Sequence, residues 1–263
     1  MPIQVHSSDN HEPGRSCPLA PLRASRRRTR NIITTLSTLL MAALIISCSP
    51  VPSDAPPSSA TPASGEGYAL LSDQQGDSPL EPGPYAVSVA DAPSAPVLPV
   101  LTVPKGYSAI EDGIGVIAGE KDERFVWVWN IELVNTHPCD AGGYAAAVGP
   151  SAADLANALA SQPLRNGTEP VPVSIGSYNG FYVEVSVPDD IDIDKCGGGQ
   201  FRSWPGRAQQ DGAGQVDMLW ILDVDGQRIT FDASYATSAS PAEVEELKNM
   251  VTTATFETAK EAD

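Results

Sequence analysis

Apolar and polar residues alternate through most of the chain after residue 84, and this period of two is typical of half-buried β-strands. Seven runs rich in β-branched and aromatic residues are bounded by Gly, Pro, Asp or Asn and therefore predict strands. They are Val97–Val103, Gly115–Ala118, Phe125–Leu133, Val171–Ile175, Phe181–Val187, Met218–Val224 and Arg228–Tyr235. Both faces of Phe125–Ile131 are apolar, so we expect this strand to be central in the sheet and covered on each side.

Two dipeptides between these runs predict hairpins. Asn179-Gly180 and Asp225-Gly226 favour type I′ turns, because both central residues of such a turn need a positive φ. We expect Phe181–Val187 to pair antiparallel with the strand that ends before Asn179, and Met218–Val224 to pair with Arg228–Tyr235. The sheet is therefore predicted to be mainly antiparallel.

Two segments depart from this period and predict amphipathic helices. The first begins after Ser151, carries two leucines one turn apart, and is expected to end before Pro163. The second begins at a capping box formed by Ser240 and Glu243, with a proline at the first helical position. We expect an α+β fold, a mainly antiparallel sheet with two amphipathic helices packed on it.

The first 48 residues have the pattern of an export signal. The arginine cluster of residues 26–30 precedes the apolar stretch Ile32–Ile46, and Ser47 and Cys48 follow. A basic segment, an apolar segment and a small residue form a secretory signal, and the cysteine after it resembles the bacterial lipobox. The resemblance implies removal of residues 1–47, diacylation of Cys48, and a lipid-anchored protein on the outer face of the plasma membrane.

An uncleaved membrane anchor is the alternative, but 15 apolar residues are fewer than the roughly 20 that a membrane-spanning helix needs. Residues 48–83 are rich in Pro, Ser and Ala and poor in apolar bulk, so they are expected to form a disordered tether. Residues 84–263 remain for a single α+β domain.

Composition limits the partners and the redox state. The net charge is −17, which opposes binding to nucleic acid, so we expect none as a partner. The expected partners are the membrane, through the lipid on Cys48, and an unknown envelope protein or small ligand. Cys139 and Cys196 are the two cysteines left after the signal and the lipid site, and an exported location favours a disulfide between them.

Candidate catalytic chemistry is sparse. His137 is the one histidine after the signal segment, and no nucleophile-elbow pattern accompanies it, so a solvated loop histidine is favoured over a triad base. Four aspartates between Asp189 and Asp194 could suggest calcium, but they lack the EF-hand spacing. Carboxylates for glycoside hydrolysis stay open, because their separation is a spatial property. We predict no catalytic residue, metal or cofactor.

The segment 189–214 is the most informative loop. It has no periodicity, and loops longer than about 15 residues are usually functional or disordered. It carries Phe201, Arg202, Trp204 and Arg207, and Trp and Arg commonly anchor recognition surfaces. A disulfide between Cys139 and Cys196 would bring His137 close to this loop. His137 and the four loop residues therefore form the candidate binding surface. The alternative is that Phe201 and Trp204 plug one end of the sheet while the arginines find local carboxylates.

Several segments, among them PSAADLANALASQP, YNGFYVEVSVPDD, CGGGQFRSW and DMLWILDVDGQRITFDASY, resemble an uncharacterised family of actinobacterial secreted lipoproteins. That family brings no catalytic residues to carry over. The order of sheet and terminal helix is also similar to PsbP-like folds, by architecture alone. The expected function is a membrane-anchored, non-enzymatic binding or envelope-accessory module, and the alternative is a secreted hydrolase that uses carboxylates or His137.

Overall fold

The structure is a computed structural model that describes residues 67–74, 76–92, 95–116, 123–140, 142, 144–205 and 212–258. All of them belong to the compact unit Ser58–Asp263. The predicted signal 1–47, the lipidation site Cys48 and the candidate binding residue Arg207 lie outside the described residues. Within the described ranges, no helix is both long enough and apolar enough to span a membrane.

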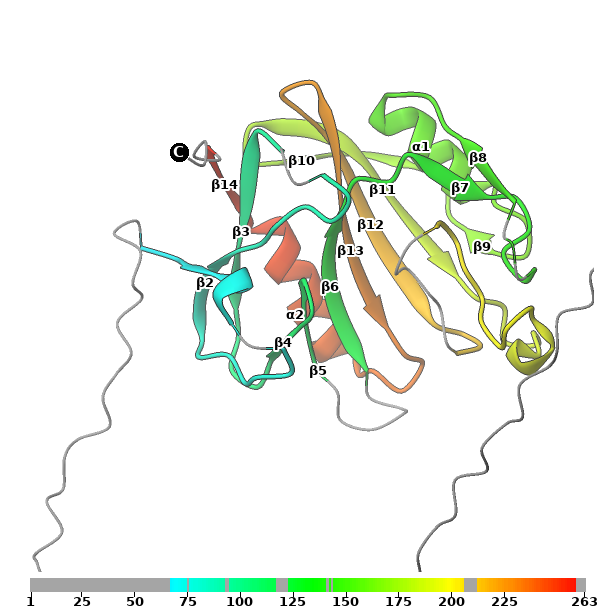
Figure 1. The fold of residues 1–263 in the computed structure, drawn as a ribbon, viewed down its shortest axis with the longest axis horizontal. Helices are drawn as coiled ribbons and strands as arrows, with labels where there is room; N and C mark the ends of the chain where they lie inside the picture. Colours follow the sequence, from blue (N-terminus) through cyan, green and yellow to red (C-terminus); the bar gives the residue numbers. More distant parts are fainter. Residues whose placement is uncertain are drawn as a thin grey trace, which may run out of the picture. The chain divides into compact units, whose positions relative to one another are not determined.

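The largest sheet has its strands in the order β10-β11-β12-β13-β6-β5-β4, with the short β9 beside β11. Every neighbouring pair in it is antiparallel. Its strands are β4 (Ser108–Ile110), β5 (Gly113–Val116), β6 (Arg124–Trp129), β9 (Asn166–Gly167), β10 (Val171–Ile175), β11 (Tyr178–Ser186), β12 (Val216–Val224) and β13 (Gln227–Tyr235). Figure 1 shows this sheet running through the domain.

A second sheet has the order β1-β2-β3-β14, and a two-stranded sheet joins β7 to β8. These strands are β1 (Ala69–Leu70), β2 (Gly83–Ala86), β3 (Val97–Val103), β14 (Thr255–Thr258), β7 (Leu133–Asn135) and β8 (Ala145–Ala147). The helices are α1 (Ala152–Ala160) and α2 (Pro241–Thr252), with 3-10 turns η1 (Leu71–Asp73) and η2 (Ile193–Lys195). A mostly antiparallel sheet with two α-helices confirms the predicted α+β class.

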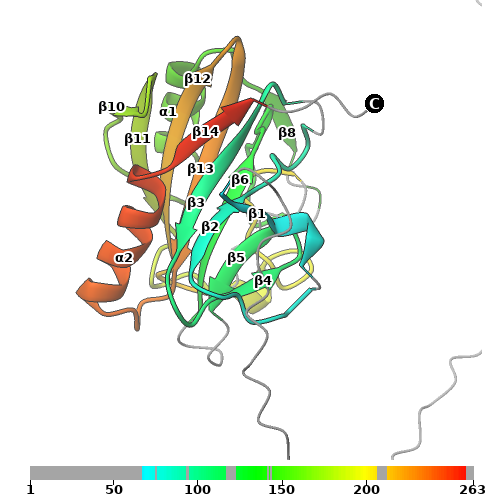
Figure 2. The ribbon, with the colours of Figure 1, turned by 90° about the vertical axis from the view of Figure 1, so that its left-hand side faces the viewer.

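The two faces of the large sheet contribute to two separate cores, because successive residues of a strand point to opposite faces. Val126, Phe231 and Leu247 of α2 belong to one core, which also contains buried residues of the second sheet. Leu155 of α1 and Leu219 belong to the other. Figure 2 shows α2 and the second sheet in front of the large sheet, with α1 behind it.

The helix starts were predicted correctly. Ser151 and Ser240 both have extended backbone, and each hydroxyl accepts from the backbone N–H of the third helical residue, Asp154 and Glu243 respectively. Both carboxylates accept in return from the N-cap backbone N–H. These hydrogen bonds lower the pKa of Asp154 and of Glu243, so each capping box is strongest with its carboxylate ionised.

One of the two hairpin predictions is correct in full. Val224 pairs with Gln227 across Asp225 and Gly226, whose φ angles of 47° and 86° are both positive, as a type I′ turn requires. The other prediction has the right strands and the wrong turn. Ile175 pairs with Tyr178, so the turn residues are Gly176 and Ser177.

Asn179 and Gly180 lie inside β11. A Cβ atom at Gly180 would overlap the backbone carbonyl of Ile221 on β12. This glycine is therefore needed for the close approach of two strands, which is a second common reason for glycine inside a strand.

The domain begins earlier than predicted. Tyr68, Leu71 and Leu80 are all more than nine-tenths buried, and Leu71 and Leu80 belong to the core that contains α2. The prediction of a disordered tether as far as residue 83 is therefore wrong from Gly67 onward. The apolar residues scattered through this polar, proline-rich segment are enough to anchor the segment to the core.

Candidate functional site

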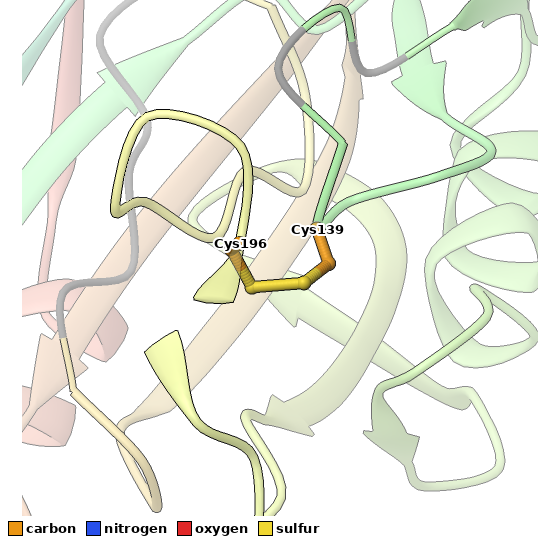
Figure 3. Close-up of a disulfide and its surroundings, with 2 residues drawn as sticks. All are labelled: Cys139 and Cys196. Carbon is orange, nitrogen blue, oxygen red and sulfur yellow. A yellow bond between two sulfur atoms is a disulfide. The ribbon is translucent and has the colours of Figure 1, made fainter. Parts of the chain in front are cut away.

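The disulfide organises the predicted binding loop. Cys139 and Cys196 are joined, with their Cα atoms 4.5 Å apart, which confirms the predicted disulfide; Figure 3 shows the bridge between two loops. Backbone hydrogen bonds continue the attachment, from Gly197 N–H to the carbonyl of Cys139 at 2.6 Å and from Arg202 N–H to the carbonyl of Pro138 at 2.9 Å. The loop is therefore tied along its length to the segment that follows β7.

His137 lies near this attachment, in an exposed turn. Its ring stands edge to face against Tyr144, with the ring centroids 5.0 Å apart, and its Nδ1 lies 3.0 Å from Oγ1 of Thr136. That hydroxyl donates to the carbonyl of Tyr144 at 2.8 Å. Thr136 therefore contacts both the imidazole and the backbone of Tyr144, and these contacts hold the histidine ring against its own turn.

The aromatic residues of the loop are interior side chains. Phe201 is fully buried and Trp204 is 2 % exposed, and Trp204 stands edge to face against Trp129 at a centroid distance of 6.3 Å. The Arg202 guanidinium donates to the side chain of Gln200. The structure thus brings the predicted residues together, but Phe201 and Trp204 pack inward, as the alternative interpretation of a plug at the sheet end expects.

A buried ionic cluster lies beside this plug. Arg165 and Asp217 form an ion pair of 2.6 Å with both side chains shielded from solvent. The guanidinium also donates to the hydroxyl of Ser203 at 2.8 Å and to the carbonyl of Val185 at 2.9 Å, and it lies over the Phe201 ring. These contacts hold the loop against the sheet.

Asp232 on β13 is the second buried carboxyl of this face. Trp129 Nε1 donates to its Oδ2 at 3.3 Å, whereas its Oδ1 has no hydrogen-bond partner among the described residues. Burial, then the charge of Asp217, raise the pKa of Asp232 well above its ordinary value. Asp232 is therefore a neutral carboxylic acid in conditions where most carboxyl groups are ionised.

The two carboxyls bear on the hydrolase alternative. Asp217 pairs with Ser234 across β12 and β13, which places Asp232 at the diagonal position, where Cα atoms are typically about 7–8 Å apart. Glycosidases also use two neighbouring carboxyl side chains, with the carboxyl groups themselves roughly 5–9.5 Å apart. However, Asp217 is fully buried and Asp232 is 4 % exposed, so this structure presents neither carboxyl to a substrate.

An open hollow lies at the end of the large sheet, on the same face as these carboxyls. Its volume is about 600 Å³, and the residues that line it include Glu123, Phe125, Gln215, Ser234, Thr237 and Ser238. We call it the sheet-end pocket. The lining residues come from the starts of β6 and β12 and from the end of β13. The strand register brings these three strand ends together.

Phe125, at the pocket, begins a row of aromatic rings on alternate residues of β6. The Phe125 and Trp127 centroids are 6.4 Å apart, and Trp127 stacks on Trp129 at 5.6 Å with 28° between the planes. Phe125 and Trp127 stay partly exposed, whereas Trp129 is 3 % exposed. We call Phe125, Trp127 and Trp129 the aromatic row. The strand is central, as predicted, but this face of it is covered only toward Trp129.

A smaller hollow of about 180 Å³ lies at that covered end, lined by Trp129, Trp204 and neighbouring residues. Among the described residues, no group of three His, Cys, Asp or Glu side chains could hold a metal ion. The sheet-end pocket is the larger of these two hollows, and it is lined by hydroxyl, amide and aromatic groups and by the Glu123 carboxylate.

Most of this site was not predictable from the sequence. Neither the cluster of Arg165, Asp217 and Asp232 nor the pocket residues Gln215, Ser234 and Thr237 stand out in it. One signal was available, because polar residues at alternate positions of Thr230-Phe231-Asp232-Ala233-Ser234 mark one face of a strand as polar. The partners of that face depend on strand register, which no local pattern contains.

Comparison with known proteins adds little. No protein-family model matches the chain, and no curated protein matches its sequence. Among solved structures, cyanobacterial PsbP (CyanoP) from Synechocystis sp. PCC 6803 is similar with a TM-score of 0.30 and 13 % identity, over 61 % of this chain and 86 % of that one. A similarity this weak carries no argument about fold or function. The resemblance to actinobacterial lipoproteins stays a prediction.

Proposed function

We propose that this protein is a membrane-anchored, extracytoplasmic binding module that holds a small polar ligand in the sheet-end pocket. The lipid on Cys48 would attach it to the outer face of the plasma membrane, and the folded domain would bind without turnover. The sheet-end pocket is the observation that carries this proposal. Its volume of about 600 Å³ falls within the usual range for ligand pockets, roughly 300–1,000 Å³.

The chemistry of the pocket supports binding of an uncharged group. Hydroxyls of Ser234, Thr237 and Ser238 and the amide of Gln215 line it, and each can both donate and accept hydrogen bonds. Glu123 also lines the pocket, and its carboxylate repels an anion. The overall charge of −17 also disfavours an anionic ligand.

The hydrolase alternative finds less support. Among the residues considered for it, His137 lies in an exposed turn and is not among the residues that line the sheet-end pocket, and Asp217 and Asp232 are at most 4 % exposed. A catalytic carboxyl pair must contact the bond that it cleaves. Catalysis would require the loop that carries Phe201 and Trp204 to leave the sheet.

A thermal-shift screen of the folded domain tests the proposal. A panel of neutral sugars, polyols, amino acids and short peptides should contain a class that raises Tm. A ligand at about 100 times its Kd stabilises by about 2.7 kcal/mol, which is roughly 5–10 °C for a domain of this size. Thr237→Trp fills the pocket from an exposed rim position and should abolish the shift.

The matched control is Thr258→Trp, an exposed threonine on β14, which should leave the shift intact. Equal shifts in both variants would place the ligand elsewhere. Turnover of a glycoside, peptide or ester that is lost in His137→Ala, a substitution at an exposed position, would replace the binding function with the hydrolase alternative.

A further inference from the structure

We propose that the sheet-end pocket and the adjoining aromatic row bind an uncharged saccharide, with sugar rings stacked on Phe125 and Trp127. This inference rests on the proposed binding function and names its ligand class. It is carried by the orientation of the two rings, by the polar groups beside them and by the charge of the surroundings.

Two glycines give the rings room to pack against the neighbouring strand. Gly115 pairs with Phe125 across β5 and β6, and a Cβ atom at Gly115 would overlap the Phe125 ring. A Cβ atom at Gly113 would lie 2.6 Å from the six-membered ring of Trp127. Because both positions lack a side chain, the two rings pack against β5, and both side chains stay partly exposed.

A flat aromatic face next to hydroxyl groups matches the surface of a pyranose. One side of such a ring carries C–H groups that pack on an aromatic face, while its rim carries hydroxyls that need hydrogen-bond partners. Ser234 lies directly across from Phe125 in the strand register, and Gln215, Thr237 and Ser238 line the same pocket. These polar groups therefore share the pocket with Phe125, where they can pair with the hydroxyls of a bound sugar.

Two rings in sequence favour a chain of sugars over a single one. The centroids of Phe125 and Trp127 lie 6.4 Å apart with 37° between the planes, and the Phe125 end opens into the pocket. One sugar unit would sit in the pocket on Phe125, and the next would lie on Trp127. The acidic chain and the Glu123 carboxylate at the pocket disfavour a uronate or phosphate polymer.

Tryptophan fluorescence offers a direct test. The four tryptophans of the chain are Trp127, Trp129, Trp204 and Trp220, and the last three are 2–4 % exposed. Trp127 is thus the one that acrylamide can reach in the folded domain. Neutral hexasaccharides of glucose, mannose, galactose and N-acetylglucosamine are the probes, and at least one should protect this fluorescence from acrylamide. A galacturonate hexasaccharide should not.

Substitutions assign the protection to the site. Phe125→Ala should weaken binding of the protective saccharide roughly tenfold or more, and Thr237→Trp should abolish it. Tyr144→Ala is the matched control, since this tyrosine is 65 % exposed on the separate β7–β8 hairpin, and it should bind like the unmodified domain. If Phe125→Ala unfolds, the exposed Thr237 position still decides the outcome.

The outcomes separate this inference from the proposed function. If no neutral hexasaccharide protects Trp127, while a peptide or an amino acid raises Tm in the domain but not in Thr237→Trp, the saccharide class is wrong and the binding function stands. If no compound gives either signal, both are wrong. Equal protection by the galacturonate hexasaccharide would overturn the choice of an uncharged ligand.

Discussion

Arg165 and Asp217 meet at 2.6 Å in the interior, with neither side chain exposed to solvent. Arg165 comes from the segment between α1 and β9, and Asp217 comes from the start of β12. Through its other hydrogen bonds, Arg165 also binds Ser203 of the disulfide loop and the backbone of Val185. One buried cation thus joins the sheet to the loop that plugs it.

Removal of one member of this pair should be severe. Arg165→Met leaves the Asp217 carboxylate buried without its cation, and such changes typically cost about 3–5 kcal/mol. The double variant Arg165→Met with Asp217→Leu removes both charges and should cost less than the sum of the single changes. Urea unfolding of all three variants measures this. Single substitutions that each cost under about 1 kcal/mol would show that the pair contributes little to folding.

Asp232 should make the free energy of unfolding of the domain depend on pH. Its folded pKa is raised, so the folded domain holds a proton that the unfolded chain releases above the ordinary aspartate pKa of about 3.9. This contribution to stability is complete below about pH 4 and is lost as pH rises toward the folded pKa. The loss is at most about 1.4 kcal/mol per pH unit.

Asp232→Asn tests this directly, because the amide has no proton to release and still offers an oxygen to Trp129 Nε1. Urea unfolding at several pH values from 4 to 8 should show the variant gaining stability relative to the unmodified domain as pH rises. A stability difference that stays constant with pH would mean that Asp232 titrates alike in the folded and unfolded states.

The local part of the fold was predictable from sequence. Alternating apolar residues identified the long strands, and Ser151 and Ser240 marked both helix starts, because capping depends on residues within one turn. Asp225-Gly226 specified its turn for the same reason. Asn179-Gly180 carries the same local signal but lies within β11, where Gly180 is required by its contact with Ile221. A tertiary contact accounts for that glycine, and sequence alone does not distinguish the two cases.

The candidate site was much less predictable. Phe125 and Ser234 are more than 100 positions apart in the sequence, and only the register of β6 against β13 places them side by side. Trp204 has the composition of a recognition residue, yet its burial depends on which surface the loop covers. Contacts between residues far apart in the sequence determine the site, whereas local patterns determine the strands and helices that support it.

The disulfide should stabilise the domain substantially. Cys139 and Cys196 are 57 positions apart, and closing a loop of that length corresponds to about 4 kcal/mol on the chain-entropy model. The double variant Cys139→Ser with Cys196→Ser should lose an amount of this order in urea unfolding. Alkylation of the unreduced domain should leave its mass unchanged. A mass increase for two free thiols would disprove the bridge.

The predicted lipid anchor depends on Cys48. Cys48→Ala removes the acceptor thiol, so the protein should lose fatty-acid label and leave the membrane fraction. Metabolic labelling with a radioactive fatty acid, followed by membrane fractionation, measures both effects. Cys139→Ser is a suitable control, since it removes a different cysteine and should keep the label. Undiminished labelling of Cys48→Ala would contradict the lipidation prediction.

Trp204 distinguishes the two roles that the sequence left open for the disulfide loop. Its side chain is 2 % exposed and packs edge to face on Trp129, so Trp204→Ala should cost about 3–5 kcal/mol through the cavity it leaves. Tyr144→Ala, at an exposed position, should change stability by no more than about 0.5 kcal/mol. Urea unfolding compares the two. If Trp204→Ala kept full stability and lost ligand binding instead, the loop would be a recognition surface. The ligand would then bind at the loop and not in the sheet-end pocket.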